Sequence, residues 1–178
     1  MIENKIGIIV GTNRNDSFTG TIGKYYEKQL KAKGQQTQLI NLNNLPHDFA
    51  FSALYQNSGK NVDFNEFQKA IDTCNKIIFI VPEYNGSIPG VVKTFIDGLR
   101  HPDSLSNKKV CLVGVSSGVL GNAVGLGHLN DILSYLNANV LGLRIKLGMA
   151  NKNFENGEFT NLTYQNFVEK QINGFLEF

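Results

Sequence analysis

Several features that would mark a specialised class of protein are missing from this sequence. The formal net charge is +2 over 178 residues, and lysines and arginines form no run. The chain therefore lacks the basic surface that nucleic acids or anionic membranes attract. The longest apolar stretch, residues 77–82, is far shorter than the roughly 20 residues that span a bilayer. We expect no nucleic-acid partner and no membrane association.

Cysteine is also scarce, because Cys74 and Cys111 are the two examples in the chain. Cys74 is predicted to lie near the end of a helix and Cys111 inside a strand. Two unpatterned cysteines are typical of reduced thiols in a cytosolic protein. The N-terminal residues enter a predicted strand directly, without the regions of a signal peptide. We therefore expect a cytoplasmic protein without a disulfide.

Histidine is the third scarce residue type. His47, His101 and His128 do not stand at metal-ligand spacing from one another, from a cysteine or from a carboxylate. We therefore predict no metal site. We expect these histidines at the surface or at helix ends rather than in catalysis.

What remains is the composition of an ordinary globular domain. Hydrophobic residues make up 42% of the chain and charged residues 18%, which is typical of soluble proteins. No internal repeat, low-complexity segment or linker divides the chain. Residues 1–178 are therefore predicted to form a single domain.

Apolar runs and amphipathic segments alternate along the chain. Short runs rich in valine and isoleucine indicate strands that are buried on both faces of a parallel sheet. They cover residues 6–10, 38–40, 77–81, 110–115 and 140–143. Segments with helical periodicity separate and follow them. These helical segments cover residues 21–33, 63–74, 88–99, 122–137 and 163–176.

This alternation predicts an α/β fold with three layers and a five-stranded parallel sheet. Right-handed crossovers make the sheet doubly wound, and we expect the strand order 2-1-3-4-5. Residues 43–62 break the pattern, and a connection of that length is usually functional or disordered. Its apolar residues Phe49, Phe51, Leu54 and Tyr55 argue against disorder. A lid or subunit contact and a packed surface loop are both open interpretations.

The predicted strand order places a ligand site beyond the carboxyl ends of strands one and three. The loop after strand one, residues 11–20, offers Arg14, hydroxyl groups and the start of a helix. Phosphate binding needs these three components. The loop lacks the glycine patterns of nucleoside triphosphate and dinucleotide sites, which favours a monophosphate. The alternative is a polar loop in which Thr19 or Thr21 only caps the helix.

The loop after strand three, residues 82–90, contains two prolines and two glycines. These residues fix a tight turn with Asn85-Gly86 as its apex, and Tyr84 adds an aromatic face. Such a loop is suited to a flat heteroaromatic ring, although it could be a turn that merely starts a helix. The loop after strand four, residues 116–122, has small residues that permit close approach of a ligand, which is a weak signal by itself.

Together these loops resemble the NADPH-dependent FMN reductase family, a flavodoxin-like family that includes quinone, azo-dye and chromate reductases. Residues 82–97 resemble its P-E-Y-N-x-S-x-P-G-x-L-K-N-x-I-D signature. The loop after strand one resembles its G-S-x-R-x-x-S-x-N phosphate loop, and the loop after strand four resembles its S-x-G turn. The resemblance extends over nearly the whole chain.

The resemblance implies a set of FMN-binding residues. The first loop would hold the phosphate, the second would run along the isoalloxazine ring, and the third would lie on the other side of the ring. The expected set is Thr12, Asn13, Arg14, Ser17, Phe18, Thr19, Pro82, Glu83, Tyr84, Asn85, Gly86, Ser116, Ser117 and Gly118.

The resemblance also implies an activity. The protein would be an FMN-dependent NAD(P)H oxidoreductase that reduces a flavin, quinone, azo compound or chromate. NADPH or NADH would donate the electrons in a ping-pong reaction through flavin N5, without a catalytic side chain. A homodimer or homotetramer is expected.

Three other kinds of protein with the same fold are alternatives to this enzyme. A non-enzymatic FMN electron carrier is the main alternative, although such carriers tend to be strongly acidic. A receiver-type signalling domain needs clustered acidic residues, whereas these strands end in Gly11 and in Pro82-Glu83. A member that has lost flavin and acts as a regulator is a third possibility.

The chain departs from the family pattern at a few positions. Thr12 replaces a serine and keeps the hydroxyl, whereas Thr19 replaces an asparagine and removes an amide donor. Gly98 replaces a common tryptophan, which removes a large apolar contact from the usual subunit packing. Residues 121–127 lack an arginine and glycine pattern that is often present there.

Overall fold

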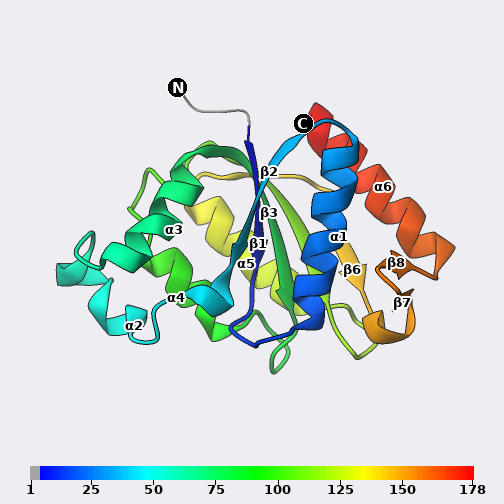
Figure 1. The fold of residues 1–178 in the computed structure, drawn as a ribbon, viewed down its shortest axis with the longest axis horizontal. Helices are drawn as coiled ribbons and strands as arrows, with labels where there is room; N and C mark the ends of the chain where they lie inside the picture. The colour runs from blue at the N-terminus through cyan, green and yellow to red at the C-terminus, as the bar shows by residue number, and fades with distance from the viewer. Residues whose placement is uncertain (1–4) are drawn as a thin grey trace.

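A parallel β-sheet with helices on both faces forms the centre of the computed structural model, which describes residues 5–178 (Figure 1). Its long strands are β1 (Lys5–Val10), β2 (Gln36–Asn41), β3 (Cys74–Pro82) and β4 (Lys109–Val115). The order is β2-β1-β3-β4-β5, and all pairs in this sheet are parallel. The predicted fold class and strand order are therefore confirmed.

The fifth position of the sheet is divided between two short strands. β5 (Asn139–Val140) and β6 (Ile145–Leu147) both pair with β4, and the register shifts by two residues between them. Buried Gln171 donates its amide Nε2–H groups to the carbonyls of Leu112 and Leu143 across this interruption. The predicted strand 140–143 thus coincides with the interruption, because a polar side chain replaces part of the ladder.

The helices cover the sheet in two groups (Figure 1). α1 (Phe18–Ala32) and α6 (Leu162–Glu177) lie on one face, and α3 (Val62–Asp72), α4 (Gly90–Gly98) and α5 (Ala123–Tyr135) lie on the other. These five helices correspond to the five predicted segments, with bounds that differ by a few residues.

Two apolar clusters hold these layers together, and β3 contributes to both. Its residues Ile77, Phe79 and Val81 pack toward α3, α4 and α5. Ile78 and Ile80 alternate with them and pack toward α1 and α6. A strand buried on both faces needs an unbroken apolar run, and each such side chain contributes roughly 1.5–3 kcal/mol on burial.

Cys74 lies at the first residue of β3, so its predicted place near the end of a helix is wrong. The preceding helix α3 ends at Asp72. Lys108 Nζ donates to the carbonyls of Ile71 and Cys74, which satisfies acceptors exposed where the helix ends. Cys74 and Cys111 are both free and buried, and burial raises the pKa of the Cys111 thiol well above its usual range.

The segment 43–62 is a packed surface connection with short helices of its own. It contains most of η1 (Leu42–Asn44), all of α2 (Phe49–Ser52) and η2 (Tyr55–Asn57), and the first residue of α3. Phe49 and Leu54 are buried. Phe51 and Tyr55 are 84% and 79% exposed. Phe49 and Leu54 therefore anchor the segment to the core.

Gly98 makes room for that segment. A Cβ atom at this position would lie 2.6 Å from Phe64 Cζ and 3.2 Å from Leu54 Cδ1. The space beside the end of α4 is thus filled by the chain itself. This packing accounts for a glycine where the family often has tryptophan.

A small hairpin completes the structure beside α1. It follows η3 (Ala150–Lys152) and consists of β7 (Phe154–Glu155) and β8 (Glu158–Phe159). Tyr25 of α1 meets the rings of Phe154 and Phe159 edge to face, with centroids 5.7 and 5.0 Å apart. Within residues 5–178, no helix has the length and apolar character to cross a membrane.

Candidate functional site

A cavity of about 250 Å³ lies at the carboxyl ends of β1, β3 and β4. The loops after these strands line it together with the start of η3. Its lining residues are Arg14, Asn15, Asp16, Ser17, Phe18, Thr19, Pro82, Glu83, Tyr84, Val115, Ser116, Ser117, Ala150 and Asn151. The three loops that were singled out in the sequence therefore meet at one place.

The first loop ends at a helix terminus that is open to an anion. Ser17 is the N-cap of α1, and its Oγ accepts a hydrogen bond of 3.0 Å from the Gly20 N–H. The helix cap is therefore Ser17, and the alternative prediction of Thr19 or Thr21 is wrong. The N–H groups of Phe18 and Thr19 have no backbone acceptor within residues 5–178. Free N–H groups at a helix start favour a negatively charged ligand.

Arg14 adds a positive charge beside this terminus. Its side chain is exposed, and no carboxylate of the described residues lies within ion-pair distance of it. A guanidinium group in this position can bind a phosphate with two hydrogen bonds. Asn13 is exposed and does not line the cavity.

Thr12 connects the first loop to the second. It is fully buried, and its Oγ1 lies 2.7 Å from the Tyr84 hydroxyl. The same Oγ1 accepts a hydrogen bond of 3.2 Å from the Arg14 N–H. The Thr12 hydroxyl therefore positions Tyr84 and Arg14 from behind the cavity lining.

The second loop contains a rigid two-residue turn. The Tyr84 N–H donates to the Ser87 carbonyl at 3.0 Å, and the Ser87 N–H donates to the Tyr84 carbonyl at 3.1 Å. Asn85 and Gly86 have φ angles of 52° and 74°, a combination that Asn-Gly adopts readily. Asn85-Gly86 is thus the apex of the turn, as predicted. Both residues are exposed beside the cavity.

Asn122 fixes the second loop against α5. Its Nδ2 donates to the carbonyls of Val81 and Pro82 at 3.3 and 3.0 Å. Its backbone N–H donates to Glu83 Oε2 at 3.0 Å. The side chain is 1% exposed, and the residue adopts a φ of 61°. The end of β3 is therefore attached to the beginning of α5 by three hydrogen bonds from one residue.

The third loop is held mainly by Ser116. Its Oγ donates to the Gly118 carbonyl and accepts from the Gly121 N–H, both at 2.9 Å. The Ala150 N–H donates to the Ser116 carbonyl at 3.0 Å, which brings η3 to the cavity. Ser117 is exposed in the cavity lining, and Gly118 lies beside it.

The expected residues thus separate into three groups. Most of them line the cavity, namely Arg14, Ser17, Phe18, Thr19, Pro82, Glu83, Tyr84, Ser116 and Ser117. Thr12 lies behind it, and Asn13, Asn85, Gly86 and Gly118 lie outside the lining. Five lining residues lie outside the expected set, namely Asn15, Asp16, Val115, Ala150 and Asn151. Buried Asn122, which fixes the second loop, was also not expected. Asn122 carries a recognisable signal, because a Gly-Asn pair at the start of a helix indicates left-handed backbone.

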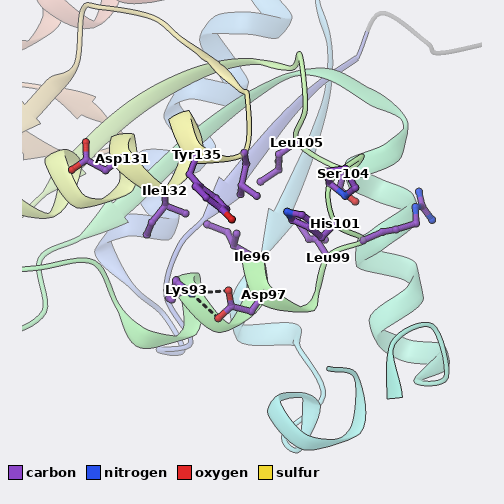
Figure 2. A pocket seen from close by; sticks show the side chains of 13 residues that line it. Lys93, Ile96, Asp97, Leu99, His101, Ser104, Leu105, Asp131, Ile132 and Tyr135 are labelled. Atoms are coloured by element: carbon purple, nitrogen blue, oxygen red, sulfur yellow. Dashed lines mark hydrogen bonds and ion pairs between the residues drawn. The ribbon is translucent and has the colours of Figure 1, made fainter. Parts of the chain in front are cut away.

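A larger hollow of about 450 Å³ lies between α4, α5 and the segment that follows α4 (Figure 2). None of the expected cofactor-binding residues lines it. Ile96 and Ile132 contribute apolar surface from the two helices, and Lys93 pairs with Asp97 at 2.7 Å on its edge. Tyr135 is 80% exposed and belongs to the same surface. This surface is separate from the three loops.

The sheet order and the loops at its carboxyl edge are the arrangement of a flavodoxin-like protein. The comparison with family models is more specific. Residues 4–151 match the model of the NADPH-dependent FMN reductases, so the chain belongs to that family.

Characterised relatives agree with this assignment. A 2-hydroxy-1,4-benzoquinone reductase of a Burkholderia species is 29% identical over 139 residues, which cover 74% of this chain and 71% of the relative. A quinone reductase of Escherichia coli strain K12 is 31% identical over 136 residues, which cover 75% and 71% of the two chains.

Solved structures show the same fold. The flavoenzyme FerB of Paracoccus denitrificans, an NAD(P)H:(acceptor) oxidoreductase, superimposes with a TM-score of 0.82. The identity is 21%, and the alignment covers 98% of this chain and 96% of FerB.

Family membership makes this protein an NAD(P)H-dependent oxidoreductase with FMN as its cofactor. The cavity fits that cofactor on its own features. Free N–H groups and Arg14 at one end suit a phosphate, and the rigid turn beside Tyr84 suits a flat ring.

Proposed function

We propose that this protein reduces a small acceptor, with a quinone as the first candidate, using electrons from NADPH or NADH. The observation that carries the proposal is the meeting of an open helix N-terminus and a rigid aromatic turn in one cavity. The characterised relatives named as quinone reductases support a quinone. A flavin, an azo compound and chromate are further acceptors to test.

The two ends of the cavity have different proposed roles in FMN binding. At one end, Arg14 and the N–H groups of Phe18 and Thr19 bind the phosphate, and Ser17 holds the helix start in place. The N–H groups have no backbone acceptor in the described residues and α1 directs them outward. The phosphate therefore meets both the guanidinium group of Arg14 and the helix dipole.

At the other end, residues 82–86 run along the isoalloxazine ring, and Ser117 and Gly118 lie on its other side. Tyr84 is held by Thr12, and Asn122 holds the backbone that precedes it. The N–H groups of Asn85 and Gly86 have no backbone acceptor among residues 5–178. They are free to donate to the ring and to stabilise negative charge on it.

Bound FMN supplies hydride transfer through its N5 atom, which permits a ping-pong reaction with donor and acceptor in turn. The residues of this chain position the ring. We assign no acid or base to a side chain, because hydride transfer through the flavin requires none.

Steady oxidation of NADPH or NADH tests this function. The purified protein, loaded with FMN, should oxidise the nicotinamide in proportion to an added benzoquinone and should show parallel lines in a double-reciprocal plot. An electron carrier would hold FMN but show no sustained turnover with any of the four acceptor types. That result would contradict the proposed activity.

We also propose that the protein is a homodimer or homotetramer that associates through the surface between α4 and α5 (Figure 2). This surface offers both an apolar hollow and the exposed Tyr135. It carries cations and carboxylates, including Lys93 and Asp131. A patch with both signs of charge can be complementary to itself across a two-fold axis.

Light scattering measures this association. The wild-type protein should have at least twice the mass of one chain, and Tyr135→Arg should shift it toward the monomer. A monomeric wild-type protein would contradict the proposal.

We also propose that the protein is cytoplasmic and that residues 1–178 form a single domain. Free, buried Cys74 and Cys111 support the proposed cytoplasmic location. The two core clusters lie on opposite faces of one sheet, which supports a single domain over residues 1–178.

A further inference from the structure

The phosphate end of the cavity carries a carboxylate beside its cation. Asp16 lines the cavity between Arg14 and Ser17, and its side chain is exposed. No ion pair joins Asp16 to a cation of the described residues. The charge of Asp16 is therefore not neutralised by a direct partner within the loop.

The charge balance of the whole lining is unusual for a site that receives a phosphate. The charged residues of the lining are Arg14, Asp16 and Glu83, which makes one cation and two carboxylates. Glu83 accepts a hydrogen bond from the start of α5 at the ring end. Asp16 is thus the carboxylate that stands next to the phosphate-binding groups.

Backbone geometry alone does not account for this residue. Asp16 has a φ of 48°, a left-handed conformation that aspartate and asparagine adopt more readily than most residues. Asparagine would satisfy the backbone without a charge. The carboxylate has a separate consequence, because a phosphate with one to two negative charges is repelled by it.

We infer that Asp16 is a specificity-determining residue that weakens the preference of the site for phosphorylated flavins. The site would then also accept flavins without a phosphate, such as riboflavin. This inference rests on the proposed flavin site. The opposite charges of Arg14 and Asp16 cancel in part, so the phosphate adds less to the affinity and binding depends mainly on the ring.

Flavin titrations test the inference without an activity assay. The fluorescence of FMN and of riboflavin is measured during titration with wild-type protein, Asp16→Asn and Asp103→Asn. Asp103 is an exposed carboxylate outside the cavity lining, so it controls for the change in net charge. Asparagine retains the backbone preference of position 16.

The wild-type protein should bind FMN less than about a hundredfold more tightly than riboflavin. Asp16→Asn should tighten FMN binding about threefold to tenfold and change riboflavin binding by less than about twofold. This gain in FMN affinity should shrink as the salt concentration is raised, because Arg14 and Asp16 are exposed and salt screens their charges. Asp103→Asn should leave both affinities unchanged.

Two results would overturn the inference while the proposed flavin site stands. One is an FMN affinity that Asp16→Asn leaves unchanged, and the other is a wild-type preference for FMN above about a hundredfold. Failure of the wild-type protein to bind either flavin would overturn the proposed site itself.

Discussion

The two ends of the cavity are built in different ways. The ring end is fixed by short hydrogen bonds that connect three loops and α5, with Thr12, Tyr84 and Asn122 at the contacts. The phosphate end consists of exposed residues around Arg14 and the open start of α1. Geometry therefore dominates at one end and electrostatics at the other. Substitutions at the first should affect stability, and substitutions at the second should affect the affinity for charged ligands.

The largest effect is expected at Asn122. Replacing it with alanine removes two buried hydrogen bonds and leaves the carbonyls of Val81 and Pro82 without their donor. We expect Asn122→Ala to lower the free energy of unfolding by about 2–4 kcal/mol, measured by urea denaturation. Asn130→Ala, within α5, should change the free energy of unfolding by less than about 1 kcal/mol. Equal effects of the two variants would contradict the structural role of Asn122.

Arg14 should show the reverse behaviour. Arg14→Ala should weaken FMN binding by roughly 1.5–3 kcal/mol, because it removes a charge-assisted hydrogen bond to the phosphate. The free energy of unfolding of this variant should stay close to that of the wild type, since the Arg14 side chain is exposed. Calorimetric titration with FMN and with riboflavin separates the contribution of the phosphate from that of the rest of the flavin. An unchanged FMN affinity would show that Arg14 does not bind the phosphate.

Tyr84→Phe should have a smaller effect on stability. It removes the hydrogen bond to Thr12 and keeps the ring, so we expect a loss of about 0.5–1.5 kcal/mol in the free energy of unfolding. Tyr135→Phe provides the control, because that tyrosine is 80% exposed. A loss of similar size in both variants would mean that the link between the two loops adds no stability.

The smallest effect concerns salt. With one cation and one carboxylate at the phosphate end, raising the ionic strength from about 0.05 to 0.2 M should weaken FMN binding by less than about threefold. Riboflavin binding should be insensitive to the same change. A loss of tenfold or more in FMN affinity would show that attraction between Arg14 and the phosphate dominates this end. The charges of Arg14 and Asp16 would then not balance.

The features that the sequence predicts correctly are those with a local signal. Unbroken apolar runs indicated the strands, and the strand order followed from the crossover rule. The Asn85-Gly86 turn was predicted because its left-handed backbone restricts the residues that can form it.

Features that depend on distant residues were not predictable in this way. Gln171 interrupts the fifth strand from a helix near the end of the chain. Asn151 reaches the cavity from the segment after β6, which carries no motif. The buried state of the Thr12 hydroxyl depends on a contact with Tyr84, 72 residues away in the sequence. Only tertiary packing determines such positions.

The central claim is that this cavity holds FMN and that NADPH or NADH reduces it. The most direct measurement is an absorbance spectrum of the purified protein with added FMN, before and after NADPH or NADH is added without air. We predict flavin bands that accompany the protein through gel filtration and that bleach with one of the two nicotinamides. Bands that persist with both donors, or a protein that takes up no flavin at micromolar concentration, would contradict the claim.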